Sequence, residues 1–280
     1  MNRSDEDSAR SRPPGPRTSL VTGASSGIGR AIAEALAQRG DRVALLARRR
    51  ERLEEVAAAL PPASDGSAHL VLPADLTDSG AIAAAIETLR AEFGRLDLLV
   101  NDAGMGYRAL VTELEPDLVR RVFATNVEGL LHMCRLAHPL LAVSASPVVV
   151  NVASVVGRRG IPGQSVYAAS KAAVCSIGEA LRLEWAADGI RVCTLNPALT
   201  TTGFFDAQPN PAGLPDPDLS GSATPESVAL EVLALDERPR PERSLRWKWW
   251  LLGALTPIFP HLSDRLTVKR LGGGWRVPRW

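Results

Sequence analysis

Short apolar runs alternate with longer helical stretches along this chain, and the alternation limits its fold more than any other feature. Each run is about five residues long and apolar on both faces, which is typical of parallel strands covered by helices on both sides. The runs span residues 19–23, 42–47, 69–75, 96–101, 147–154 and 190–197. Right-handed strand–helix–strand units of this kind predict an α/β fold with one doubly wound parallel sheet and helices on both faces.

The stretches between the runs carry the usual signals of helix ends. Arg30–Arg39 stops at Gly40, and Asp78–Phe93 begins on an acidic cap and stops at Gly94. A glycine directly after a helix adopts the left-handed conformation that ends it, and an Asp at the start accepts free backbone N–H groups. These signals predict one helix that ends at Arg39 and another that ends at Phe93, each between two successive apolar runs.

The two ends of the chain differ from this regular middle part. Residues 1–17 are charged and Pro-rich with no apolar stretch, which predicts a disordered extension and not a signal peptide. Residues 18–239 form the predicted single α/β domain. Residues 240–280 form a tail with nine Lys or Arg against two acidic residues, and with five of the chain's six Trp.

The tail has two interpretations. Basic residues interleaved with Trp and Leu suit peripheral contact with a membrane through residues 246–280. Alternatively, the apolar part of the tail covers the substrate cleft or a neighbouring subunit. No stretch of the chain reaches the roughly 18 consecutive apolar residues that a membrane span requires.

Composition excludes several classes of function. A formal net charge of +1, from 32 basic and 31 acidic residues, argues against a nucleic-acid-binding protein. The cysteines form no CxxC pair, so we expect neither a disulfide framework nor a zinc site, and we expect a reducing, cytoplasmic location. The four histidines show no metal-ligand spacing, and no metal site is predicted; they are His69, His132, His138 and His261.

A glycine-rich turn follows the first strand and leads directly into a helix. Its glycines, Gly23, Gly27 and Gly29, have the spacing G-x-x-x-G-x-G. Small residues let the backbone bend sharply and approach a pyrophosphate, which the amides at the helix N-terminus then bind. The turn therefore predicts a dinucleotide site, with Ser25, Ser26 and Ile28 as its other contact residues.

The end of the second strand indicates which dinucleotide binds. An acidic residue there would accept the ribose hydroxyl of NAD, but this chain has Arg48. A guanidinium pairs with a 2′-phosphate, so NADP(H) is predicted and NAD(H) is the alternative. The following residues, Arg49, Arg50 and Arg52, are expected on a solvated helix face. Asp75 and Leu76, which close the third strand, are expected at the adenine.

Tyr167 and Lys171 form the predicted catalytic pair. Their i, i+4 spacing places them on one face of a helix. A nearby ammonium favours the tyrosinate, so we expect Lys171 to lower the pKa of Tyr167 and prepare it as a general acid or base. Ser154, at the end of the fifth strand, is expected to hold the oxygen of the substrate.

Together these residues resemble the short-chain dehydrogenase/reductase family over about residues 18–235. The family's Asn-Asn-Ala-Gly motif matches Asn101-Asp102-Ala103-Gly104, with Asp102 in place of the second Asn. Its active-site Asn matches Asn126, and its catalytic Ser, Tyr and Lys match Ser154, Tyr167 and Lys171.

The resemblance implies a single-domain Rossmann fold and hydride transfer between a nicotinamide and a carbonyl or alcohol. Tyr167 would exchange the proton, Lys171 would hold the nicotinamide ribose, and Asn126 would maintain a water that links Lys171 to solvent. Residues after the sixth strand would also contact the cofactor, with Thr202 at its carboxamide. The other expected cofactor residues are Asn101, Ala103, Gly104, Pro197 and Thr200.

The substrate side is less determined by the sequence. The substrate, a small, moderately lipophilic carbonyl or alcohol, is expected to contact Tyr107 with its loop, residues 155–164 and a lid that follows Pro197 and is Pro-rich over 206–218. The resemblance also implies a homodimer or homotetramer. A different class, a non-catalytic dinucleotide-binding sensor or scaffold on the same fold, remains the alternative.

Overall fold

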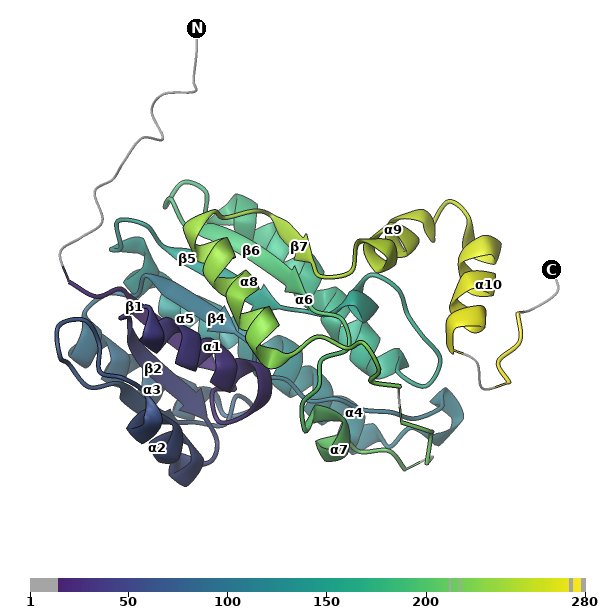
Figure 1. Cartoon of the computed structure of the whole chain (residues 1–280), viewed down its shortest axis with the longest axis horizontal. Coiled ribbons are helices and arrows are strands. Elements are labelled where there is room, and N and C mark those ends of the chain that lie inside the picture. Colours follow the sequence, from purple (N-terminus) through teal and green to yellow (C-terminus); the bar gives the residue numbers. More distant parts are fainter. Residues whose placement is uncertain (1–14, 212, 217, 272–273, 278–280) are drawn as a thin grey trace, which may run out of the picture.

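A seven-stranded parallel sheet forms the centre of the molecule in the computed structural model, which describes residues 15–211, 213–216, 218–271 and 274–277. The strand order is β3-β2-β1-β4-β5-β6-β7, so the chain reverses its direction of travel across the sheet between β1 and β4 (Figure 1). The strands are β1 (Thr18–Thr22), β2 (Arg42–Ala47), β3 (Leu70–Pro73), β4 (Leu98–Asn101), β5 (Val148–Val152), β6 (Arg191–Asn196) and β7 (Glu242–Ser244). The predicted doubly wound parallel sheet is confirmed.

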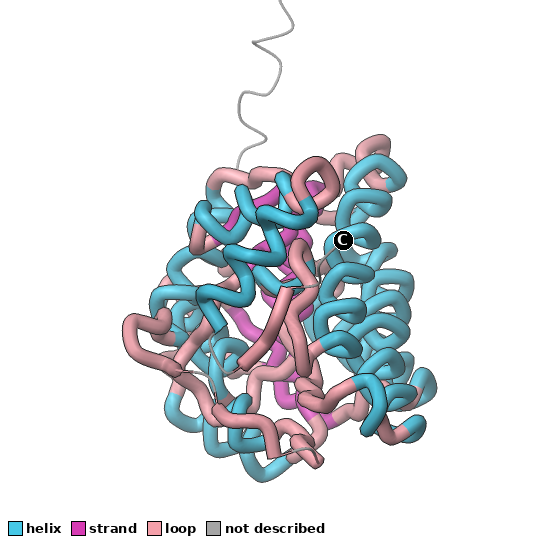
Figure 2. The backbone as a smooth tube through the Cα atoms, turned by 90° about the vertical axis from the view of Figure 1, so that its right-hand side faces the viewer, coloured by secondary structure: helices cyan, strands magenta, loops and turns pink. Residues whose placement is uncertain are grey.

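Helices cover both faces of this sheet, as Figure 2 shows along its edge. One face packs on side chains of α1 (Gly27–Gln38), α2 (Arg50–Ala59) and α8 (Pro225–Glu237). The other packs on α3 (Ser79–Phe93), α5 (Gly129–Ala142) and α6 (Ser165–Glu184). The remaining helical segments are η1 (Val111–Glu113), α4 (Pro116–Phe123), η2 (Ala124–Glu128), η3 (Val155–Gly157), α7 (Phe204–Ala207), α9 (Trp247–Leu255) and α10 (Pro260–Leu271).

The predicted helix ends are confirmed by their cap geometry. Asp78 accepts hydrogen bonds from the backbone N–H groups of Gly80 and Ala81, at 2.8 and 3.1 Å. Gly94 follows α3 with φ of +69°, and Gly40 follows α1 with φ of +93°. Both glycines occupy the left-handed region, where a side chain would be strained.

The seventh strand lies beyond the predicted boundary of the domain. β7 pairs with β6 in parallel register, with Leu195 opposite Arg243. The boundary at residue 239 is therefore wrong, because the sheet continues to Ser244. The sequence of β7, Glu-Arg-Ser, has no apolar residue, since a short edge strand is not buried on both faces.

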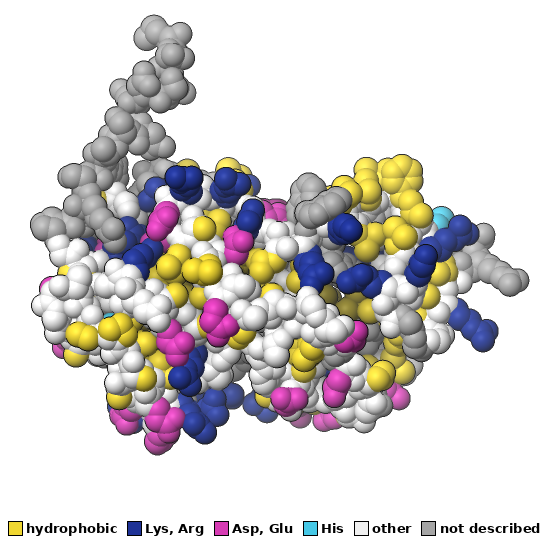
Figure 3. All heavy atoms as spheres, viewed as in Figure 1, with side chains coloured by type: hydrophobic (Ala, Val, Ile, Leu, Met, Phe, Trp, Pro, Cys, Tyr) yellow, Lys and Arg dark blue, Asp and Glu magenta, His cyan; other side chains and the backbone are white. Residues whose placement is uncertain are grey.

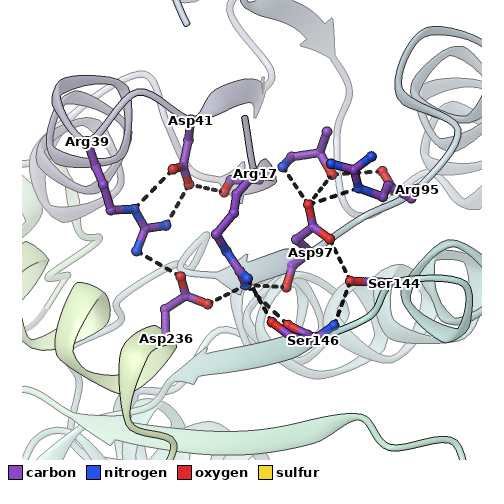
Figure 4. Close-up of polar contacts among 10 residues, drawn as sticks. Arg17, Arg39, Asp41, Arg95, Asp97, Ser144, Ser146 and Asp236 are labelled. Carbon is purple, nitrogen blue, oxygen red and sulfur yellow. Dashed lines mark hydrogen bonds and ion pairs between the residues drawn. The ribbon is translucent and has the colours of Figure 1, made fainter. Parts of the chain in front are cut away.

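A polar cluster lies at the end of the sheet where β1 begins, and Figure 4 shows its contacts. Arg17 is buried and pairs with Asp236 of α8 at 2.7 Å, and Arg39 pairs with the other oxygen of Asp236 at 2.8 Å. The predicted extension of residues 1–17 is thus wrong at Arg17, which belongs to the domain. Residues 1–14 of that extension lie outside the described residues.

Asp97 is the second acidic centre of this cluster. Its carboxylate accepts hydrogen bonds from the Thr18 backbone N–H at 2.9 Å and from the Ser144 hydroxyl at 2.5 Å. Burial acts to raise the pKa of Asp97, but these bonds and the nearby Arg95 and Arg17 outweigh it and hold the pKa below its ordinary value. The ionised form is therefore the one that the fold stabilises.

Candidate active site

A cleft of about 1700 Å³ opens where the parallel strands end at their carboxyl termini. It runs from the glycine turn after β1, across the ends of β4 and β5, to the segment after β6 and to α10. The reversal of strand order between β1 and β4 creates this crevice, which is where open α/β sheets bind ligands.

The glycine turn forms one wall of the cleft and has no room for side chains. Gly23 has φ of +75°, and a Cβ there would lie 3.0 Å from the backbone of Ala103. A Cβ on Gly29 would lie 2.5 Å from the carbonyl oxygen of Gly23. The first turn of α1, from its N-cap Ser26, therefore presents its backbone to the cleft. This arrangement fits the pyrophosphate of a dinucleotide, which needs close backbone approach and free amides.

Thr22 holds the two glycine-containing loops together. Its hydroxyl accepts hydrogen bonds from the backbone N–H groups of Asp102 and Ala103, both at 3.0 Å. The loop after β4 is thereby fixed against the end of β1, with Ala103 and Gly104 on the cleft surface. Sequence reasoning did not assign this role to Thr22.

Asp102, the acidic departure from the family motif, lies under the glycine turn. Its carboxylate accepts a hydrogen bond from the backbone N–H of Gly29, and its Oδ2 lies 2.8 Å from the position of a Cβ on that glycine. Burial raises the pKa of Asp102 to about 7, although Lys171 and the Gly29 amide act in the opposite direction. A carboxyl group that titrates near neutral pH therefore contacts the anion-binding turn.

The far end of the cleft carries two arginines. Arg48 and Arg49 are both exposed and line the cleft, and Arg49 donates to the Ser25 hydroxyl at 3.5 Å. The sequence assigned Arg49 to a solvated helix face, and that assignment is wrong, because Arg49 is the N-cap residue that precedes α2 and lies beside the turn. Asp75 and Leu76 line the same end, as expected; Asp75 Oδ1 accepts from the backbone N–H and hydroxyl of Thr77.

Asn101 does not reach the cleft, and its assignment as a cofactor residue is wrong. It is buried between β4 and β5, where its Nδ2 donates to Asn151 Oδ1 at 2.9 Å and to the sulfur of Cys134 at 3.3 Å. The Asn101 side chain therefore packs in the core beside α5, while the loop that follows β4 lines the cleft.

The three predicted catalytic side chains meet in the middle of the cleft. Ser154 lies two residues after β5, as the N-cap residue of η3, and its hydroxyl is hydrogen-bonded to that of Tyr167 on α6. Lys171, one helical turn further, places its Nζ 5.9 Å from the centre of the Tyr167 ring and donates to the Val152 carbonyl at 2.8 Å. The geometry brings together a phenol, a hydroxyl and an ammonium.

The predicted effect of Lys171 on Tyr167 is not found. Burial raises the pKa of Tyr167 well above its ordinary value; the Ser154 hydrogen bond opposes this and the charge of Asp102 adds to it. Burial also lowers the pKa of Lys171. The expectation of a lowered tyrosine pKa is wrong for this arrangement, because the ammonium lies 5.9 Å from the ring centre and desolvation of the phenolate dominates. Tyr167 is therefore held as the neutral phenol.

Asn126 lies in η2, a turn of π-helix between α4 and α5. Its Oδ1 accepts from the Met105 backbone N–H at 2.7 Å, and its Nδ2 donates to the Met105 carbonyl at 3.0 Å and to Ser170 Oγ at 2.9 Å. A Cβ on Gly104 would lie 3.4 Å from both Asn126 Oδ1 and Lys171 Nζ, so these two groups flank the same glycine. A π-helical turn at a functional residue is a recurring device for placing a side chain.

The segment after β6 returns to the glycine turn. A Cβ on Gly27 would lie 3.4 Å from the methyl group of Thr202, which places this threonine against the turn. Thr200 is buried, and its hydroxyl donates to the Ala198 carbonyl at 3.0 Å. The cleft lining therefore contains every predicted cofactor residue except Gly29 and Asn101; those after β6 are Pro197, Thr200 and Thr202, and those of the first turn are Gly23, Ser25, Ser26, Gly27 and Ile28.

Apolar side chains from the lid cover the reacting groups. The Phe204 ring lies 5.6 Å from that of Tyr167, centre to centre, and also 5.6 Å from that of Phe205. Gln208 lines the same space, and its Nε2 is buried without a hydrogen-bond partner. Tyr107, expected here, is instead 1% exposed in a separate core, where its hydroxyl accepts from the Glu115 backbone N–H. An unsatisfied buried donor beside phenyl rings suits a substrate with one polar group.

The tail reaches the cleft, as one of the two interpretations of its sequence expected, but through residues that the sequence did not single out. Leu266, Lys269, Arg270 and Leu271 of α10 line the cleft, as does Arg246 before α9. Their sequence gives no signal of this, because the path of the chain after β7 decides where α10 lies.

Comparisons with known proteins agree with this geometry. The family model described as "short chain dehydrogenase" matches residues 17–211. Carbonyl reductase family member 4 of Danio rerio is 35% identical over 80% of this chain and 92% of its own.

Two solved structures are similar over most of the chain. A 3-ketoacyl-(acyl-carrier-protein) reductase from Brucella melitensis complexed with NADH has 28% identity and a TM-score of 0.72, with 82% of this chain and 96% of that chain covered. An alcohol dehydrogenase from Thermococcus sibiricus complexed with 5-hydroxy-NADP has 27% identity and a TM-score of 0.74, with the same coverage of both chains. With its parallel sheet, its glycine turn and its Ser-Tyr-Lys cluster, this chain belongs to the short-chain dehydrogenase family and is an oxidoreductase.

Proposed function

We propose that this protein is an NADP(H)-dependent carbonyl reductase that converts a moderately lipophilic ketone or aldehyde to the alcohol. The observation that carries the proposal is the meeting of Ser154, Tyr167 and Lys171 in the cleft that begins at the glycine turn. A bound nicotinamide dinucleotide supplies the hydride. The residues of the chain bind and orient the dinucleotide and the substrate, and they transfer the proton.

The proton chemistry follows from the state of Tyr167. Burial raises its pKa, so at neutral pH the phenol carries its proton and can donate it to a carbonyl oxygen. Ser154, hydrogen-bonded to that phenol, holds the same oxygen in place. Tyr167 takes up the proton in the reverse reaction, so the direction depends on the ratio of reduced to oxidised dinucleotide. Lys171 and Asn126, whose polar atoms both lie close to Gly104, form the route by which the proton is replaced.

A non-catalytic sensor is the weaker candidate. A sensor needs the dinucleotide cradle but no hydroxyl pair aligned for proton transfer, and here the Ser154–Tyr167 bond is made. A complete proton-transfer set favours the enzyme.

Lipophilic carbonyls are expected to be the better substrates. Phe204 packs on Tyr167, Phe205 packs on Phe204, and Gln208 offers one unpaired donor. An aryl or alkyl ketone should therefore exceed a sugar or phosphorylated carbonyl by at least about tenfold in kcat/KM. The measurement is NADPH oxidation over a panel of carbonyl compounds. Phe204→Ala should reduce the preference. Faster turnover of the sugar and phosphorylated carbonyls than of the aryl and alkyl ketones would contradict this assignment.

The two arginines at the far end of the cleft are expected to select NADP(H) over NAD(H). A hydrogen bond to a charged group contributes about 1.5–3 kcal/mol, so Arg48→Ala or Arg49→Ala should weaken NADPH binding by at least about tenfold and leave NADH binding nearly unchanged. Dinucleotide titrations by fluorescence measure both affinities. Arg52→Ala is the matched control, because Arg52 pairs with Glu55 on the exposed side of α2. Equal losses for both dinucleotides would show that these arginines do not read the phosphate.

A further inference from the structure

Exposed apolar side chains concentrate in the two tail helices. Among the described residues, 13 large hydrophobic side chains are exposed, and seven of them lie between residues 251 and 271. Six of these seven form what we term the apolar ridge, which begins on α9, crosses the connection and continues on α10: Leu251, Leu255, Ile258, Phe259, Leu262 and Leu266. Exposed apolar surface gathered in this way marks a binding surface.

The orientation of α10 is the reverse of that of an ordinary surface helix. Its buried residues are Ser263 and Thr267, each 2% exposed, whereas Leu262 is 54% exposed. The Ser263 hydroxyl is 2.7 Å from that of Thr256, and Thr267 donates to the Ser263 carbonyl at 2.8 Å. The hydroxyl groups of Ser263 and Thr267 thus face inward and have hydrogen-bond partners within the tail, while the leucines face outward. A helix that only covers the domain would bury its apolar side.

The two helices are fixed to the domain. Gly253 of α9 leaves room for the backbone of Arg158, since a Cβ there would lie 2.8 Å from its carbonyl oxygen. Asp264 of α10 pairs with Arg159 at 2.6 Å, and Arg158 pairs with Glu242 of β7 at 2.7 Å. The ridge is therefore held at a defined place beside the loop that follows η3.

Positive charge borders the ridge. Arg265 and Lys269 are exposed and lie on α10 next to Leu262 and Leu266 in sequence, while Asp264 is paired with Arg159. In Figure 3 the apolar side chains gather over α9 and its connection to α10, and basic side chains lie along α10. An apolar strip edged by cations complements an anionic lipid surface, which accepts apolar side chains below its negative headgroups.

We propose that the α9–α10 surface docks on an anionic membrane. No helix among the described residues is long and apolar enough to cross a bilayer, so this contact is peripheral. The position of the ridge gives the contact a use. Leu266 belongs both to the ridge and to the cleft lining, so docking brings the opening of the cleft to the lipid surface. A lipophilic compound dissolved in the bilayer then enters the cleft without crossing bulk water.

The test compares binding of the full chain to two kinds of vesicle. Phosphatidylcholine vesicles with about a third of phosphatidylglycerol should bind at least about tenfold more tightly than phosphatidylcholine alone, and salt near about 1 M should remove the difference. Ile258→Gln with Phe259→Gln should lower binding to the anionic vesicles by about tenfold. Arg265→Gln should lower it about fivefold, which is the contribution expected of one cation near an anionic leaflet.

The control variant combines Val111→Gln and Val143→Gln. These valines are 70% and 65% exposed, close to the 67% and 53% of Ile258 and Phe259, but they lie outside the tail. The control should bind vesicles like the wild type. Equal binding of the ridge variant and the wild type, or no binding of wild type to either vesicle, overturns the proposal. The proposal is also overturned if the wild type is a dimer that does not bind vesicles and the ridge variant is a monomer, because a second copy would then cover the ridge. If the ridge variant unfolds at lower temperature than wild type, Arg265→Gln decides the outcome.

Discussion

Tyr167→Phe is expected to lower kcat by about 10³-fold and to change dinucleotide affinity by less than about twofold. The phenol is the group that shares a hydrogen bond with Ser154 and lies under the Phe204 ring, so its proton is the one available to a carbonyl oxygen. Phenylalanine keeps the ring contacts and removes only the hydroxyl group that carries this proton. Steady-state NADPH oxidation gives kcat, and a fluorescence titration of the dinucleotide gives the affinity.

The chain offers a matched control, since its other tyrosine is Tyr107. Its hydroxyl accepts a backbone hydrogen bond from Glu115 at 2.8 Å inside a small core and lies outside the cleft lining. Tyr107→Phe removes the same atom and should lower the unfolding temperature with little change in kcat. Full turnover by Tyr167→Phe would refute both the mechanism and the proposed reductase, whereas vesicle binding by the tail would be unaffected.

Asp102→Asn is expected to stabilise the protein, and to do so more at high pH than at low pH. Burial raises the pKa of Asp102 to about 7 in the folded protein, whereas an aspartate in the unfolded chain titrates near its ordinary value of 3.8. The folded state therefore binds more protons between these two pH values, and wild-type stability falls as the pH rises through this window. Asparagine does not titrate, so its advantage should grow by roughly 2 kcal/mol from about pH 5 to about pH 8.

Urea unfolding of both proteins at several pH values measures this difference. The advantage of the variant should disappear below about pH 4, where the carboxyl group is protonated in both states, and should stay constant above about pH 8. A gain that is equal at all pH values would show that asparagine acts through packing or hydrogen bonding at Gly29 and that Asp102 carries no buried charge.

The sequence predicted the parts of the molecule that depend on local pattern. Apolar runs of uniform type indicated six of the seven strands, and the spacing of Gly23, Gly27 and Gly29 indicated the turn at the first strand end. These features can be read from the sequence because a strand buried on both faces requires apolar residues, and a backbone that closely approaches a ligand requires glycine. β7 escaped prediction because an edge strand of three polar residues has no such requirement.

The misassigned residues depend on direction and on distance, which sequence does not contain. Asn101 and Ala103 are two residues apart, yet Ala103 lines the cleft and Asn101 does not. The spacing of Tyr167 and Lys171 correctly placed both on one helical face, but the pKa of the tyrosine depends on burial from every surrounding element. Likewise, α10 lies at the cleft with its Asp264 paired to Arg159, a residue 105 positions away in the sequence.

The ion pair between Arg17 and Asp236 also constrains how this protein is made. It joins two residues 219 positions apart, and Arg17 directly precedes β1, which lies in the middle of the sheet. A contact of such long sequence separation forms only after nearly the whole domain has left the ribosome. Until α8 emerges, α1 lacks the helix that packs beside it, and the buried guanidinium of Arg17 has no carboxylate from Asp236. The buried ion pair that anchors the start of β1 is therefore completed late in synthesis, and a ribosome stalled before residue 236 would hold a chain in which Arg17 lacks this partner.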